Sequence, residues 1–181
     1  MLKSFAYLFM LLPTYAVRDR IAFARDLVGP MRSPIRLPML HMTLFELLNV
    51  GERHPKIVGW MRAVLADHQL RACTFALGRL IARPDIAMLK PIGPRSGLVS
   101  LRADLARMMT AAGLPASWRE RFDPHVTLGR GLSREMTLPI DPIFWNADRI
   151  ALVESWRGET HYEILETWSL VPPIQRSFEF G

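Results

Sequence analysis

The alternation of apolar and polar residues along the chain predicts three helices and eight strands. Apolar residues recur three and four positions apart in the helical segments, most clearly at Leu98, Leu101, Leu105 and Met108. Short β-favouring runs between turn signals predict the strands. We expect helices at residues 14–28, 55–69 and 97–112, and strands at 4–12, 37–48, 73–81, 85–91, 124–130, 137–146, 149–156 and 160–170.

The order of these elements predicts the fold class. It reads β-α-β-α-β-β and then α-β-β-β-β, which indicates an α+β protein with two similar lobes and mostly antiparallel sheets. A length of 181 residues favours a single domain over 1–181. We therefore expect one domain made of two pseudo-symmetric lobes, each with its own antiparallel sheet.

A tetrapeptide with histidine, threonine and leucine occurs once in each half of the chain. The first copy begins at His41 and continues to Thr43, and the second begins at His125 and continues to Thr127. Both copies lie in predicted strands, where residues two apart point to the same face, roughly 6.6 Å from each other. Two such strands facing one cleft would place two imidazoles and two hydroxyls around one small anion.

These side chains suit phosphodiester chemistry. An imidazole titrates near neutral pH, so one histidine can accept a proton while the other donates one. The hydroxyls of Thr43 and Thr127 can donate hydrogen bonds to phosphate oxygens, and Arg130 can add a fixed positive charge. No acidic residue or cysteine stands at ligand spacing from either histidine, so we expect no metal. Two half-buried strand histidines with a purely structural role remain the alternative.

Composition points to an anionic partner. The formal net charge is +6 and the sequence pI is about 10.2. Between Lys90 and Arg134, eight basic residues stand against three acidic ones. A basic globular domain most simply binds nucleic acid.

Cysteine usage and hydropathy bear on the compartment. Cys73 is the only cysteine and lies in an apolar run, so we expect a buried thiol and no disulfide. No stretch reaches the roughly 18 apolar residues of a membrane span. The apolar run from Phe5 to Leu12 is interpreted as a buried first strand rather than a signal peptide, because Pro13 ends it. We expect a cytoplasmic monomer.

Two segments carry a resemblance to a known family. The segment Pro124-His125-Val126-Thr127-Leu128-Gly129-Arg130 and the paired motifs half a chain apart resemble the two-histidine phosphoesterase superfamily. Within it, the chain is most similar to the bacterial RNA 2′,3′-cyclic phosphodiesterases, also called 2′-5′ RNA ligases. Ser155-x-x-Gly158-x-x-x-Tyr162, followed by Trp168-x-Leu170, resembles the C-terminal pattern of that family, so the likeness covers nearly the whole chain.

The resemblance implies a bilobal fold with flanking helices around a central cleft, and no metal or cofactor. It implies opening of an RNA 2′,3′-cyclic phosphate to a 2′-phosphate. By position, His41 matches the proton donor and His125 the proton acceptor. Thr43, Thr127 and Arg130 match phosphate-binding positions.

The first motif departs from the family pattern just after its threonine. Phe45 comes one position before the usual phenylalanine, and Glu46 occupies that place. Regular alternation puts Phe45 on the face of His41, where it could stack a terminal base, and puts Glu46 on the opposite face. The substrate therefore stays open between an RNA end, a small cyclic nucleotide and a 2′,5′-linked oligonucleotide. A non-catalytic RNA-end-binding protein is a further alternative.

Overall fold

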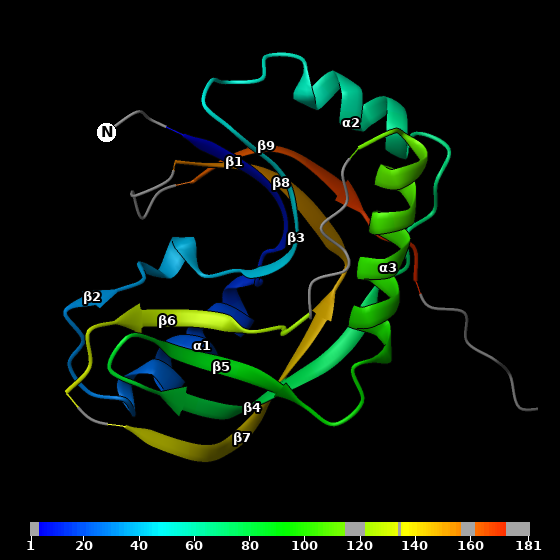
Figure 1. The fold of residues 1–181 in the computed structure, drawn as a ribbon. Coiled ribbons are helices and arrows are strands. Elements are labelled where there is room, and N and C mark those ends of the chain that lie inside the picture. The colour runs from blue at the N-terminus through cyan, green and yellow to red at the C-terminus, as the bar shows by residue number, and fades with distance from the viewer. Residues whose placement is uncertain (1–3, 115–121, 134, 157–161, 173–181) are drawn as a thin grey trace, which may run out of the picture.

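The computed structural model describes residues 4–114, 122–133, 135–156 and 162–172. The predicted order of helices and strands is confirmed, with a two-residue strand and a 3₁₀ turn added before the first motif (Figure 1). The elements are β1 (Phe5–Leu11), α1 (Tyr15–Asp26), β2 (Ser33–Pro34), η1 (Leu37–Met39), β3 (Met42–Val50), α2 (Ile57–Leu65), β4 (Cys73–Ala82), β5 (Ala87–Ile92), α3 (Ser96–Ala111), β6 (Val126–Arg130), β7 (Met136–Ala147), β8 (Arg149–Trp156) and β9 (Tyr162–Ser169).

The strands of the described residues form one continuous sheet in the order β7-β4-β5-β6-β3-β1-β8-β9, and β2 pairs with β6. Neighbouring strands in this order are antiparallel. The expectation of two separate sheets is thus wrong in detail, because the two motif strands, β3 and β6, join the halves through the pair Met42↔Val126. The site predicted from the motifs therefore lies where the two halves meet.

The helices cover the sheet and close the core. Figure 1 shows α2 and α3 side by side; α3 packs against β3 and β4, while α1 lies behind β5 and packs against β7. Thr14 caps α1 by accepting a hydrogen bond from the backbone N–H of Val17 at 3.4 Å. The predicted stripe of α3 is confirmed at its first three positions, but Met109 rather than Met108 is its fully buried methionine. No helix of the described ranges is long and apolar enough to cross a membrane.

The first motif strand begins later than predicted. Residues Leu37–Met39 form the 3₁₀ turn η1, so β3 starts at Met42, directly after His41. Pro38 explains the difference, because proline has no N–H to give to a strand and its fixed φ fits the start of a helical turn. The second motif strand starts at Val126, directly after His125. The two catalytic candidates therefore occupy the same place relative to their strands.

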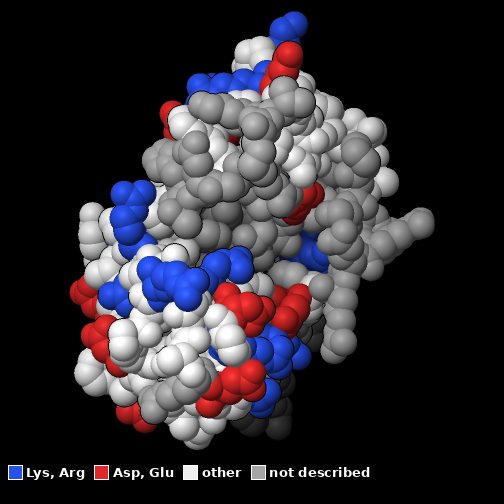
Figure 2. Space-filling model, turned by 60° about the vertical axis from the view of Figure 1, so that its left-hand side comes forward, with Lys and Arg blue, Asp and Glu red and all other residues white. Residues whose placement is uncertain are grey.

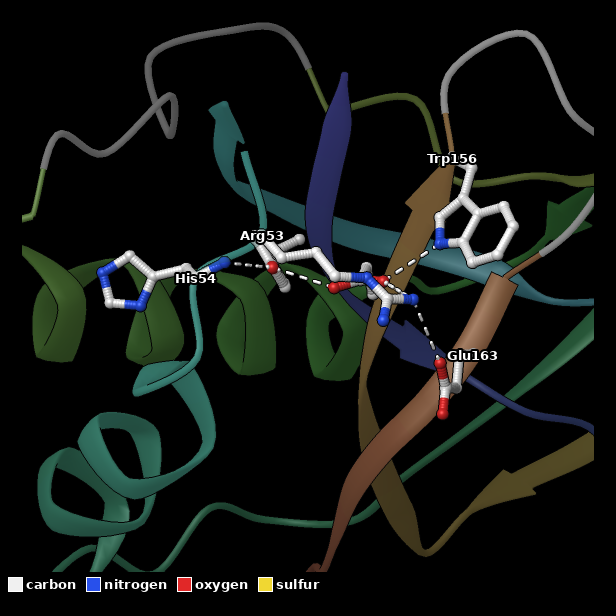
Figure 3. A network of polar contacts seen from close by, with 6 residues as sticks. Arg53, His54, Trp156 and Glu163 are labelled. Atoms are coloured by element: carbon white, nitrogen blue, oxygen red, sulfur yellow. Dashed lines mark hydrogen bonds and ion pairs between the residues drawn. The ribbon is translucent and has the colours of Figure 1, made fainter. Parts of the chain in front are cut away.

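One buried carboxylate links β1, β8 and the segment after β3. Glu154 on β8 is 4% exposed and accepts hydrogen bonds from the Tyr7 hydroxyl at 2.9 Å and the Trp156 indole N–H at 3.0 Å. Arg53 forms an ion pair with it at 2.9 Å (Figure 3). The Tyr7 hydroxyl in turn accepts the backbone N–H of His54 at 2.8 Å. This network fixes the segment after β3 to the neighbouring strand β1 and, through Glu154, to β8.

Candidate active site

The two motif histidines are held by the same kind of hydrogen bond. Nδ1 of His41 lies 2.8 Å from the carbonyl oxygen of Met39, and Nδ1 of His125 lies 2.8 Å from that of Asp123. A carbonyl oxygen only accepts hydrogen bonds, so each Nδ1 carries a hydrogen and donates it. Each ring therefore keeps Nε2 for proton exchange with a substrate.

The pairing of β3 with β6 brings the two motifs together. Met42 and Val126 are paired and fully buried in the core. The antiparallel direction then places the histidine of each motif across from the threonine of the other, where Cβ atoms are typically about 4.5–5.5 Å apart. All four of these side chains lie on the face away from Met42 and Val126 and are half-buried: His41, Thr43, His125 and Thr127.

The surroundings of His41 favour its neutral form. Burial lowers the pKa of His41, the hydrogen bond to the Met39 carbonyl opposes that shift, and the positive charge of His125 lowers the pKa further. The ring of Tyr162, the first residue of β9, meets the His41 ring edge to face, with centroids 5.3 Å apart and planes at 85°.

The first motif strand contains a β-bulge at its leucine. Between β1 and β3, the pairing steps from Phe9↔Phe45 to Met10↔Thr43, so Leu44 is an extra residue in β3. Such a residue shifts the alternation of side chains by one position. Phe45 accordingly shares the core face with Phe9 and is 2% exposed.

The second motif strand contains the equivalent bulge. Between β5 and β6, the pairing steps from Ala87↔Gly129 to Met88↔Thr127, which makes Leu128 the extra residue. Gly129 follows on the buried side together with Ala87, and the next residue returns to the side of Thr127. The leucine that recurs in both motifs is therefore the bulged residue in both.

The bulges change where three residues point. Glu46 lies on the face of Thr43, half-buried, and pairs with Leu8, so the expectation of the opposite face is wrong. Arg130 occupies the corresponding place after the second motif and is exposed. The buried Phe45 offers no ring face to a nucleobase in this structure, which removes the support for its predicted stacking role.

Lys90 and Arg102 make contacts near the site that the sequence did not predict, and the first of these positions His125. Nζ of Lys90 donates to both carboxylate oxygens of Asp123, at 2.8 and 2.7 Å, and the backbone carbonyl of Asp123 is the one that orients His125. Lys90 lies on β5, far from Asp123 in the chain. No periodicity links residues so far apart in the chain, although both are among the charged residues counted between Lys90 and Arg134.

Arg102 of α3 contacts both motif regions. Its Nε donates to the carbonyl oxygen of the bulged Leu44 at 3.1 Å. Its guanidinium carbon lies 4.9 Å from the ring centroid of Phe122, in the segment that leads to the second motif. Arg102 thus contacts the two halves on either side of the Met42↔Val126 pair.

Other candidate chemistry is weaker in the described part of the chain. No three His, Cys, Asp or Glu side chains of the described residues gather as metal ligands would. His54 lies beside Trp60, with stacked rings 5.9 Å apart, in the network of Tyr7 and Glu154. Gly158 of the C-terminal pattern and the first two residues of the strand predicted at 160–170 lie outside the described residues.

The fold is shared with solved phosphoesterases. A crystal structure described as a phosphoesterase superposes with a TM-score of 0.74 at 23% identity, covering 92% of this chain and 98% of that chain. Escherichia coli LigT complexed with phosphate gives 0.72 at 22% identity, covering 93% and 99%. TT0787 of Thermus thermophilus gives 0.71 at 23% identity, covering 91% and 97%.

Fold and paired motifs together define a two-histidine phosphoesterase. The family model of the 2′-5′ RNA ligase superfamily matches residues 19–159, most of the chain, and the protein belongs to that superfamily. None of the curated proteins matches the sequence.

Proposed function

We propose that this protein hydrolyses the 2′,3′-cyclic phosphate at an RNA end to a 2′-phosphate without a metal ion. The observation that carries the proposal is the matched pair of histidines. Each donates its Nδ1 hydrogen to the carbonyl two residues earlier, and each stands on the half-buried face of a motif strand. Two imidazoles with available Nε2 atoms can divide acid and base catalysis between them.

The proposed reaction takes one proton from the attacking water and gives one proton to the leaving oxygen. His125 Nε2 takes a proton from water as the water oxygen attacks phosphorus. The bond between phosphorus and the ribose 3′-oxygen breaks, and protonated His41 gives its Nε2 hydrogen to that oxygen. The products are a 2′-phosphate and a 3′-hydroxyl. These roles for the two histidines follow the family resemblance.

The remaining motif side chains would hold the phosphate. The hydroxyls of Thr43 and Thr127 can donate to its non-bridging oxygens, and a hydrogen bond to a charged group contributes about 1.5–3 kcal/mol. Arg130, which the bulge returns to the side of Thr127, would add positive charge. These groups would stabilise the charge that builds up on the oxygens in the transition state.

The lowered pKa of His41 sets a condition on this mechanism. Burial favours neutral His41 in the free protein, yet a proton donor must be charged. A bound phosphodiester is negative and favours the protonated ring. Binding of the substrate would therefore favour protonation of His41, the proposed acid catalyst.

Single substitutions test the proposal. His41→Ala and His125→Ala should each lower kcat about 10²–10⁴-fold on a cyclic-phosphate-ended RNA. His68→Ala, at an exposed position after α2, is the matched control and should leave kcat unchanged. Full activity in either motif variant would overturn the proposal, and so would strong inhibition by EDTA.

A modified substrate separates the two roles. Sulfur in place of the ribose 3′-oxygen leaves as a thiolate and needs no proton. This substrate should restore much of the activity of His41→Ala and little of that of His125→Ala. The opposite result would exchange the two roles.

A small nucleotide is the second candidate substrate. Escherichia coli LigT, whose fold this chain shares, has been crystallised with 3′-AMP and with ATP. Parallel assays of a cyclic mononucleotide, a 2′,5′-linked oligonucleotide and a cyclic-phosphate-ended RNA would rank the candidates by kcat/KM. Tight RNA binding without turnover of any of them would favour a non-catalytic RNA-end-binding protein.

A further inference from the structure

Exposed arginines gather where the second motif strand ends. Arg130 closes β6 and is paired with Ser33 of β2. The backbone N–H of Arg32 donates to the carbonyl of Gly131 at 3.1 Å. The side chain of Arg32 lies against the same glycine, because a methyl group added to Gly131 would come within 2.6 Å of Arg32 Cβ. The Arg32 and Arg130 side chains thus leave neighbouring backbone positions.

Two more arginines extend this surface in opposite directions. Arg83 is in the hairpin between β4 and β5, which docks on the same segment through the bond from Leu132 N–H to the Pro84 carbonyl at 3.2 Å. Arg36 precedes η1, and its carbonyl accepts the N–H of Met39, the residue that orients His41. We call Arg32, Arg36, Arg83 and Arg130 the arginine surface.

The charge of the arginine surface is largely uncompensated. All four arginines are exposed, and none forms an ion pair with another residue in the part of the chain that the structure describes. Asp85, on the hairpin of Arg83, is an exposed acidic neighbour. Figure 2 shows Lys and Arg side chains across the middle of one face of the molecule, with Asp and Glu side chains adjoining them.

We propose that Arg32, Arg36 and Arg83 of the arginine surface bind the backbone phosphates of single-stranded RNA on the 5′ side of the cyclic end, beside the reacting phosphate at Arg130. The inference rests on the proposed function and extends it from the reacting phosphate to the nucleotides that precede it. The arginine surface is continuous with the catalytic groups, because Arg130 follows Thr127 in β6 and Arg36 leads into His41. Guanidinium groups match phosphate geometry by donating two parallel hydrogen bonds.

The proposal predicts a dependence on substrate length. A 2′,3′-cyclic mononucleotide has no phosphate beyond the reacting one, whereas an RNA of about six nucleotides can reach the arginine surface. Alanine at Arg32, Arg36 and Arg83, singly and together, should lower kcat/KM for the RNA, about tenfold or more in the triple variant. The same variants should leave kcat/KM for the mononucleotide unchanged. Arg130 stays unaltered because it is assigned to the reacting phosphate.

Salt dependence gives a second readout. Each lost phosphate contact should make the slope of log KM against log salt for the RNA less steep by about 0.7. Arg149→Ala is the control. Arg149 is exposed at the start of β8, which lies in the half of the sheet that does not contain β6. The control variant should match the wild-type protein on both substrates.

The outcomes separate the two proposals. Equal losses on RNA and mononucleotide, or no loss on either, would overturn the arginine surface while leaving the hydrolysis proposal intact. If neither substrate is hydrolysed, the proposed function fails. Anisotropy of a fluorescent RNA then decides: weaker binding by the triple variant supports the arginine surface, and unchanged binding overturns it.

Discussion

Replacing Lys90 tests how the second histidine is aimed. Lys90 holds the Asp123 carboxylate through two short hydrogen bonds, and the Asp123 carbonyl fixes both the direction and the protonated nitrogen of His125. Lys90→Ala removes only the first link. We expect the segment before β6 to loosen and the hydrogen bond from His125 Nδ1 to the Asp123 carbonyl to weaken, while the histidine itself stays in place.

The structure allows the effects on stability and on rate to be separated. The side chains of Lys90 and Asp123 are 24% and 53% exposed, and ion pairs this open to solvent contribute at most about 1 kcal/mol to folding. Catalysis is far more sensitive, because a shift of about 1 Å in a catalytic group can cost up to about 100-fold. We expect kcat to fall about tenfold with a change in unfolding free energy below about 1 kcal/mol.

The assay combines kinetics on a cyclic-phosphate-ended RNA, urea denaturation and ¹⁵N NMR of the histidine rings. Arg62→Ala is the matched control, since it removes an ion pair with Glu166 that lies on α2 and β9, away from both motifs. Lys90→Arg should restore kcat because it can donate two hydrogen bonds to the same carboxylate. Wild-type kcat in Lys90→Ala, or an unchanged His125 ring spectrum, would refute the positioning role.

Further predictions concern three groups that are wholly or partly buried. The pKa of His41 in the folded protein lies below its ordinary value, so the unfolded chain binds the proton more readily between those two pKa values, and stability falls as pH drops through that window. Urea denaturation should show a smaller drop in unfolding free energy from pH 7 to pH 5 for His41→Gln than for the wild-type protein, and an equal drop would contradict this. Added phosphate should raise the pKa of His41 measured by NMR, and an unchanged pKa would count against a phosphate site beside the ring. Glu154→Ala removes the acceptor of the Tyr7 hydroxyl and the Trp156 indole N–H and one of the two carboxylate partners of Arg53, so it should cost about 3 kcal/mol in the unfolding free energy. A loss below about 1 kcal/mol would show that this network contributes little to stability. Burial raises the pKa of Cys73 to about 11, so iodoacetamide at pH 8 should modify the thiol only after denaturation, and rapid labelling of the folded protein would count against its burial.

Local patterns in the sequence predicted the elements and the motifs. The repeated leucines of α3 and the alternation in the strands depend on burial along one segment, which a single sequence records. His41 and His125 could be singled out because the same tetrapeptide occurs twice. The 3₁₀ turn η1 was missed although Pro38 marks it, because the apolar run around that proline favoured a strand.

Features that depend on pairing between distant segments could not be predicted. The bulges at Leu44 and Leu128 exist only relative to β1 and β5, and each reverses the face of the residues that directly follow it, in β3 only as far as a second irregularity at Leu47. This is why Phe45 and Glu46 exchange their expected positions. The joining of two predicted sheets into one depends on a single pair between β3 and β6, which no local pattern encodes.

The position of that pair has a mechanical consequence. Met42 and Val126 immediately follow the two histidines, so a rotation of one half against the other about this pair would turn on a pivot beside the imidazoles. Points near a pivot travel least. The spacing of the two rings would stay nearly constant while the outer ends of the motif strands, at Val50 and Arg130, moved further apart. Such a hinge would let nucleotides of different size enter without changing the distance between the two histidine rings.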